Sequence, residues 1–197
     1  MAHPTAIHHR DRVVATALWR RLDTPGHDAC SLARLDDGWQ LAGTAVFRAP
    51  QATAPVHLRY VIDCGDDWCT RRGVVDGWWG ERRVAFVIGR ASSGHWTMQG
   101  SYVPGLDHCR DLDLSFTPAT NLLQLNRTAP SVGVSTDIPV AWLHIDSGEL
   151  LYLPQRYERH AAHMYFYAAA TLGFTAELAI DDDGFVRSYP GLWTRDA

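Results

Sequence analysis

Apolar and polar residues alternate over many short segments of the chain. The stretch 57–63 (HLRYVID) is the clearest case, because Leu58, Tyr60 and Ile62 fall on one face of an extended backbone. Residues 173–180 alternate in the same way, reach Asp-Asp-Gly at 182–184 and return as 185–189, which predicts a β-hairpin. Strands are also predicted for three further stretches: 39–47, 83–89 and 139–145.

Turn signals recur between these segments, and no long helical periodicity competes with them. The pattern therefore predicts a mainly β protein whose large antiparallel meander sheet curls into a half-barrel. The stretch 155–171 fits two structures. Its alanines and Glu158 favour a short helix that covers the open side of the sheet, whereas its aromatic residues favour strand. We expect strand for Tyr165–Tyr167 and leave the preceding residues open.

The chain has 197 residues, which suits one domain, and we place it at 13–197. Residues 1–12 are polar and His-rich, and we expect a disordered tail there. The apolar run Val13–Trp19 is too short for a signal peptide or a membrane span. A cytoplasmic location is therefore expected, with reduced thiols at Cys30, Cys64, Cys69 and Cys109.

The composition narrows the possible functions. All 18 basic residues are arginine, the net charge is −4, and no basic stripe is present, which argues against nucleic-acid binding. Arginine would have to form any site for an anion. The chain also has eight Trp, seven Tyr and six Phe. Aromatic residues of this kind pack a curved sheet or line a concave site for an apolar or sugar-bearing ligand.

Known catalytic and metal-binding motifs are missing from the sequence. Cys64 and Cys69 are too far apart for the usual zinc pair, and the adjacent His108 and Cys109 diverge on a strand, so buried thiols are expected in place of a metal. There is no nucleophile elbow, glycine-rich phosphate loop or dinucleotide fingerprint. We therefore expect no metal, no cofactor and no catalytic residue with a recognisable role.

Two acidic residues stand out in the segment 110–116 (RDLDLSF). On a strand, Asp111, Asp113 and Ser115 face one way, and Leu112, Leu114 and Phe116 face the core. The two carboxylates could line a polar cavity, hold a cation or act as an acid and base. The spacing of the two aspartates, taken alone, is explained more simply if they lie on a solvent-exposed outer face of the sheet.

A turn rich in hydroxyl and amide groups follows at Thr117–Asn121 (TPATN). Proline after threonine indicates a turn whose side chains can bond their own backbone. Together with the two aspartates, this segment supplies groups that bind sugar hydroxyls.

Several motifs of the chain occur together in one known family. They are HCRDLDLSFTPATN at 108–121, Trp19–Asp23 with Pro25, Gly26 and Cys30, Asp67–Arg71, Gln155–Arg159, Asp183–Val186 and Tyr189–Trp193. In this order they resemble the bacterial putative glycolipid-binding family, formerly a domain of unknown function, over about residues 18–195. The resemblance implies a large antiparallel sheet wrapped into a half-barrel, similar to scaffolds that carry lipids and lipoproteins.

The chain departs from the family pattern after Asn121. The family usually continues through a proline to a pair of arginines. Here Gln124 is found at the position of the proline, and Asn126 at the position of the first arginine. Only Arg127 of that pair remains. If the pair clamps an anionic headgroup, the ligand of this member is less charged or bound more weakly.

The resemblance implies a non-enzymatic protein that binds a glycolipid or another amphiphile, with its apolar part on the concave aromatic face. One alternative is an enzyme that uses Asp111 or Asp113 as acid and base on a small polar or anionic substrate held by arginine. A second alternative is an interaction module whose aromatic surface serves a partner or a homodimer. The expected ligand-binding residues are Arg71, Asp111, Asp113, Thr117, Asn121, Arg127, Tyr157 and Arg159.

Overall fold

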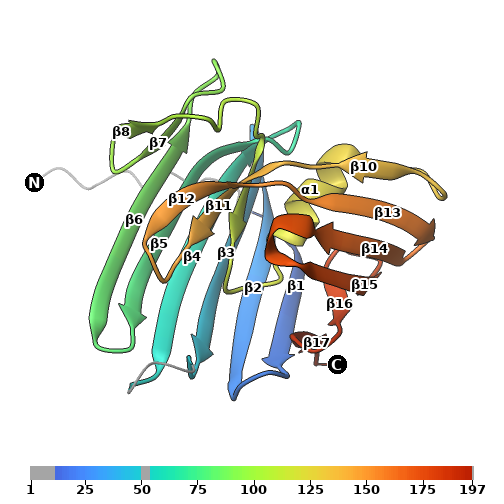
Figure 1. Ribbon diagram of the computed structural model, residues 1–197, viewed down its shortest axis with the longest axis horizontal. Helices are drawn as coiled ribbons and strands as arrows, with labels where there is room; N and C mark the ends of the chain where they lie inside the picture. The colour runs from blue at the N-terminus through green and yellow to red at the C-terminus, as the bar shows by residue number, and fades with distance from the viewer. Residues whose placement is uncertain (1–11, 50–53, 197) are drawn as a thin grey trace, which may run out of the picture.

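The computed structural model describes residues 12–49 and 54–196, and these form a large curled sheet with a smaller sheet and one helix on its inner side (Figure 1). The predicted tail at 1–12 lies, except for Arg12, outside the described residues. No helix in the described part of the chain has the length and apolarity needed to cross a membrane.

The large sheet has fourteen strands in the spatial order β10, β13, β14, β15, β16, β17, β1, β2, β3, β4, β5, β6, β7, β8. All of its neighbouring strands are antiparallel, and the two edge strands do not pair with each other, so the sheet is curled but not closed into a barrel. The strands are β1 Arg12–Arg21, β2 Gly26–Leu35, β3 Gly38–Phe47, β4 Val56–Gly65, β5 Thr70–Trp79, β6 Arg82–Arg90, β7 Trp96–Met98, β8 Ser101–Val103, β10 Ser135–Asp137, β13 Arg156–Ala161, β14 Met164–Ala169, β15 Phe174–Ile180, β16 Val186–Tyr189 and β17 Trp193–Arg195.

Alternation along the strands sets the inner face of this sheet. In β4, Leu58, Tyr60 and Ile62 are all buried, as their spacing predicts. The predicted hairpin is present as β15 and β16, joined by a turn at 181–184. The two halves of the sheet meet where β17 pairs with β1, and the Trp19 indole donates a hydrogen bond to the Val186 carbonyl at 2.6 Å.

A three-stranded sheet lies inside the curl. It consists of β9 (Asp111–Leu114), β11 (Val140–His144) and β12 (Glu149–Leu153), in the order β12, β11, β9, with β9 parallel to β11. Leu112, Leu114 and Phe116 are buried, which confirms the predicted core face of this segment. The Phe116 ring packs edge-on against Tyr60 of β4 at 5.9 Å. The inner face of the N-terminal strands is thus covered by the protein's own chain.

The sequence left open a short helix within residues 155–171, but the helix of the structure lies elsewhere. Residues 155–171 contain strands β13 and β14 and a short 3₁₀ turn, η1 (Ala170–Leu172), so the prediction of strand for Tyr165–Tyr167 is confirmed. The helix is α1, Asn121–Thr128, and it follows the predicted turn directly. Thr117 Oγ1 accepts a hydrogen bond from the Ala119 amide at 3.0 Å, so this turn does bond its own backbone. Ala129 ends α1 in a left-handed conformation, with φ of 40°.

Candidate functional site

A pocket of about 250 Å³ lies between the small sheet and the C-terminal strands of the large sheet. Its floor carries four polar side chains, and its walls are largely aromatic and aliphatic. The lining residues are Asp113, Leu114, Ser115, Thr117, Asn121, Trp142, Leu153, Tyr167, Ala169, Leu172, Phe174, Tyr189, Leu192 and Trp193. Three of the predicted ligand-binding residues, Asp113, Thr117 and Asn121, therefore share one cavity.

The small sheet positions the polar floor. In β9, alternation turns Asp113 away from the core-facing leucines, and the parallel register places it directly beside Trp142 of β11. The aromatic wall comes from β14, β15 and β16. The Tyr167, Phe174 and Tyr189 rings contact one another with centroids 5.8–6.2 Å apart. Rings that brace one another in this way give the pocket a preformed apolar wall.

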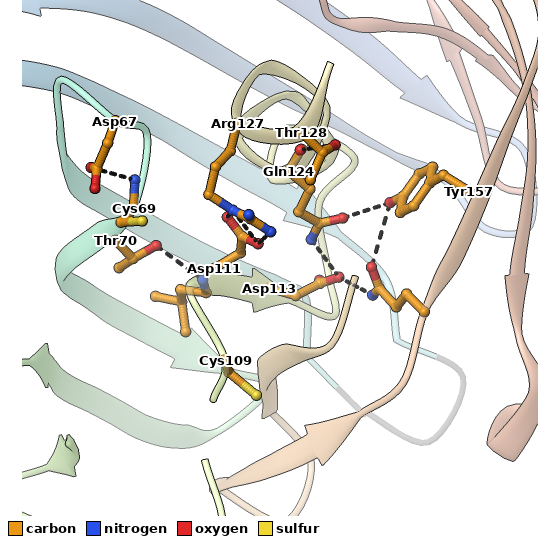
Figure 2. Close-up of polar contacts among 12 residues, drawn as sticks. Asp67, Cys69, Thr70, Cys109, Asp111, Asp113, Gln124, Arg127, Thr128 and Tyr157 are labelled. Atoms are coloured by element: carbon orange, nitrogen blue, oxygen red, sulfur yellow. Dashed lines mark hydrogen bonds and ion pairs between the residues drawn. The ribbon is translucent and has the colours of Figure 1, made fainter. Parts of the chain in front are cut away.

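Asp113 is buried and is held by uncharged donors (Figure 2). Its Oδ2 accepts hydrogen bonds from Gln155 Nε2 at 2.6 Å and from Gln124 Nε2 at 3.3 Å, and its Oδ1 accepts one from Thr120 Oγ1 at 3.3 Å. Burial raises the pKa of Asp113, and these hydrogen bonds offset that effect only in part. The proposed solvated outer face is wrong, because β9 is covered on both sides.

Tyr157 connects the helix to this carboxylate network from behind the pocket. Its hydroxyl accepts a hydrogen bond from Asn121 Nδ2 at 2.7 Å and donates one to Gln124 Oε1 at 2.6 Å. The ring is completely buried, so Tyr157 orients the pocket residues without lining the pocket itself. Gln124 contacts both Tyr157 and Asp113 and is thus a central member of the network.

A second buried carboxylate lies beneath the floor. Asp28 of β2 accepts hydrogen bonds from Thr117 Oγ1 and, at 3.0 Å, from the Tyr60 hydroxyl. Burial raises the pKa of Asp28 to about 7, although both hydroxyl groups favour its charged form. Thr117 lines the pocket, and it therefore links Asp28 to the cavity.

Asp111 does not line the pocket, and its carboxylate is paired with Arg127. Arg127 Nε lies 2.9 Å and 3.0 Å from the two carboxylate oxygens, and Nη2 lies 2.7 Å from Oδ2. Burial nevertheless raises the pKa of Asp111. Arg127 is therefore used inside the protein, against a fully buried carboxylate (Figure 2).

The remaining two predicted residues lie in other parts of the molecule. Arg71 of β5 is exposed and pairs with Asp37 at 2.8 Å, beside a separate surface pocket that also contains Cys69. Arg159 of β13 donates to the Pro130 and Ala162 carbonyls and lies over the Tyr165 ring. Neither lines the pocket that contains Asp113.

A larger hollow lies elsewhere in the described part of the structure. About 700 Å³ of space lies on the outer face of β1–β4, lined by small residues such as Ala29, Ala42 and Gly43. It contains none of the eight predicted residues. Because it lacks the combination of an aromatic wall and converging polar groups that marks a ligand site, we regard the smaller pocket as the functional candidate. In the described part of the chain, no cluster of three His, Cys, Asp or Glu side chains could hold a metal ion.

Sequence reasoning missed Asp28, Tyr60, Gln124 and Gln155. A signal for Asp28 was available, because alternation in β2 places it on the same face as Cys30 and Leu32, and a carboxylate there must be buried. The two glutamines carry no such signal, since each meets Asp113 only through the tertiary fold.

Comparison with known proteins agrees with this architecture. A crystal structure of a DUF1089 family protein from Pseudomonas aeruginosa superposes with a TM-score of 0.76 and 23% sequence identity, covering 100% of this chain and 99% of that one. This likeness shows that the two proteins share the fold. No curated protein matches the chain. Residues 16–195 match the family described as Putative glycolipid-binding, and the chain therefore belongs to that family.

Proposed function

We propose that the protein binds a glycolipid or a similar amphiphile without chemical conversion, and that the polar head of the ligand enters the pocket at Asp113. The observation that carries this proposal is the meeting of an aromatic wall and a hydroxyl- and carboxylate-bearing floor in one cavity. Sites for small ligands combine apolar walls with a few converging polar groups in this manner. The family description points to the same class of ligand.

The floor can bind hydroxyl groups of a sugar. Asp113 Oδ1 receives only one hydrogen bond within the described structure, from Thr120, and a carboxylate oxygen can accept two. A ligand hydroxyl can therefore donate to it. The Trp142 side chain lies next to Asp113 in register, and its ring offers an apolar surface for the C–H face of a sugar.

The size of the pocket limits what it holds. At about 250 Å³ it is smaller than the roughly 300–1,000 Å³ of typical small-molecule sites, so it suits a headgroup and not a whole lipid. The inner face of β4 and β5 is covered by β9 and cannot hold an acyl chain. We place the apolar part of the ligand at the rim, over Leu172 and Leu151, which are exposed by 52% and 38%. Leu151 is the cross-strand neighbour of Trp142.

A cytoplasmic location fits this function and is part of the proposal. Its support is the state of the four cysteines, all of which are free, with three of them buried. Cytosolic proteins keep their thiols reduced. Fractionation of cells that produce the protein, followed by thiol alkylation under denaturing conditions, tests this location; recovery from the periplasmic or extracellular fraction would contradict it.

The proposal is tested by blocking the pocket. Ser115 lines it and is exposed, and its hydroxyl accepts one long hydrogen bond, from the Ile145 amide at 3.5 Å. Ser115→Trp therefore fills space there at the cost of one weak bond. Ser131→Trp, at an exposed serine outside the pocket, is the matched control. Lipids are extracted from each purified protein and identified by mass spectrometry, and native mass spectrometry gives their stoichiometry. We expect an amphiphile bound to the unmodified protein and to the Ser131 variant, and its loss from the Ser115 variant. Extracts without any amphiphile would refute the proposal.

A second candidate function is acid–base chemistry on the bound ligand. It is favoured by Asp113, a carboxylate of raised pKa that borders the pocket, whereas Asp111 is tied to Arg127. Asp113→Asn keeps the size of the side chain and removes its proton-accepting charge. If the extracted ligand is converted on incubation with the protein, and the variant binds it without converting it, the enzymatic function is correct. An unchanged ligand leaves binding as the function.

A further inference from the structure

We infer that the pocket selects an uncharged, hydroxyl-bearing headgroup and rejects phosphate, sulfate and carboxylate heads. This inference rests on the proposed binding function and specifies its ligand class. It concerns the head alone, because the pocket is too small for more.

The charges around the pocket carry the argument. Asp113 is the only ionisable acid or base among the residues that line it, apart from tyrosines, and no arginine or histidine is present in that lining. Arg127 of α1 does not line the pocket, and both of its bonded nitrogens face the Asp111 carboxylate. An anionic head would thus enter without a cation to pair with it.

Rejection of an anion holds for both charge states of Asp113. If the carboxylate is ionised, it repels a second negative charge that is brought beside it. If it is protonated, the repulsion is gone, but the incoming anion still loses its water without gaining an opposite charge, and burying an unpaired ion is costly. Asp28, buried below Thr117, adds a second acidic group on the same side of the cavity.

A cationic head is also disfavoured. Asp113 already accepts hydrogen bonds from three uncharged side chains, which leaves one acceptor position at Oδ1. An ammonium group would therefore gain few contacts in return for the water that it loses. A sugar hydroxyl, by contrast, can donate to Asp113 Oδ1 and accept from other hydroxyls in the pocket, such as that of Ser115.

Four octyl amphiphiles with one chain length test the selectivity. Octyl β-glucoside and octyl β-galactoside are neutral, octyl phosphate is anionic, and octyltrimethylammonium is cationic. Binding to the full chain is measured by isothermal titration calorimetry below the micelle concentration of each compound. We expect at least one glycoside to bind about tenfold or more tightly than both charged compounds. Tightest binding of the phosphate or the ammonium compound would overturn the inference and leave amphiphile binding intact. Binding of none would overturn both.

A charge introduced at the rim gives a second test that does not depend on the choice of sugar. Leu172 lines the pocket and is 52% exposed, so Leu172→Arg places a cation at the mouth without disturbing the core. Val132→Arg, at a residue that is 57% exposed and outside the pocket lining, is the matched control. Because Leu172 is also a proposed contact for the octyl chain, the readout is the affinity of octyl phosphate relative to that of the octyl glycosides. We expect this ratio to rise at least fivefold in the Leu172 variant and to stay unchanged in the Val132 variant. An equal gain in both variants, or none in the first, would count against the inference.

Discussion

Arg127 binds Asp111 through two nitrogens, and the carboxylate that it holds is completely buried. The shortest N–O distance of this pair is 2.7 Å. Arg71 and Asp37 approach almost as closely, at 2.8 Å, but both of those side chains are more than half exposed. Arg127 contacts Asp111 through two nitrogens and Arg71 contacts Asp37 through one, and the two ion pairs also have very different surroundings. Since desolvation decides what an ion pair contributes, they should differ greatly in their effect on stability.

Removal of Arg127 should destabilise the protein strongly. Arg127→Met leaves the Asp111 charge buried and unpaired, and we expect the free energy of unfolding to fall by about 3–5 kcal/mol. Adding Asp111→Asn removes that charge and should restore part of the loss. Urea denaturation of the two single variants and the double variant measures both effects. Arg71→Met is the control and should cost less than about 1 kcal/mol; equal losses at Arg71 and Arg127 would contradict this prediction.

Asp28 should make the protein less stable as the pH rises. Its pKa is about 7 in the folded protein and 3.8 ordinarily, so between these values the folded state keeps a proton that the unfolded state has lost. The stabilisation is complete below about pH 4 and is lost as the pH rises through 7. The gap corresponds to roughly 4 kcal/mol. Denaturant melts between pH 4 and 8 should show a shallower fall for Asp28→Asn than for the unmodified protein.

The effect of Asp28 on the pH dependence of stability has to be separated from the effects of other acidic residues. Burial also raises the pKa values of Asp111 and Asp113, and both remain in the variant, so the difference between the two proteins isolates Asp28. Asp182→Asn, at a side chain that is 98% exposed, is the control and should follow the unmodified protein. A pH profile that is identical in the Asp28 variant and the unmodified protein would show that Asp28 is ionised in both states.

Removal of the Tyr157 hydroxyl should lower the stability of the protein. Tyr157→Phe preserves the packing but leaves Asn121 Nδ2 and Gln124 Oε1 without their buried partner, and we expect a loss of about 1–3 kcal/mol. Tyr102→Phe removes a surface hydrogen bond to Asp107 and should cost less than about 1 kcal/mol. Thermal or urea unfolding compares the two. Octyl glycoside binding should weaken only in the Tyr157 variant, because Asn121 lines the pocket.

Gly73 marks the contact between the large sheet and the small one. A Cβ atom at this position would lie 2.3 Å from Leu112 Cδ2, so Gly73→Ala requires the Leu112 side chain to move. Leu112 is fully buried and has little room to move, and we expect a cost of about 1–3 kcal/mol. Shortening the neighbour by Leu112→Val should recover part of it in the double variant. If the two substitutions simply add, the contact is not the cause of the loss.

Local patterns predicted the strands and their faces well. Alternation in residues 57–63 and 110–116 determines which side chains are buried, because a strand has only two faces and one of them meets the core. The helix was harder. Residues 121–128 form a single short helix after a turn, at a place where no helix was expected. Residues 164–169 (MYFYAA) form a strand, as their aromatic residues favour, and are paired on both sides by β13 and β15.

The sequence predicted only those pocket residues that lie close together along the chain. Asp113, Thr117 and Asn121 lie within nine residues, and one strand and turn bring them to the pocket. Arg71 and Arg159 were expected beside them. The strand of Arg71, β5, is far from β14–β16 in the strand order, whereas Arg159 is on β13 next to β14 but donates to the Pro130 and Ala162 carbonyls. The aromatic wall comes from β14 to β16, and nothing in the local sequence says which strands the small sheet will face. Long-range pairing is the information that the pattern lacks.

The pairing of β1 with β17 also has a consequence for how the protein is made. The bond from Trp19 to the Val186 carbonyl joins residues 167 positions apart, and the strands that flank it meet across the same boundary. During synthesis β1 is therefore an unpaired edge until nearly all of the described chain has been translated. Contacts between such distant segments form slowly, and an open edge can pair with another molecule in the meantime. Production at low temperature or with a chaperone that shields nascent strands should raise the soluble yield.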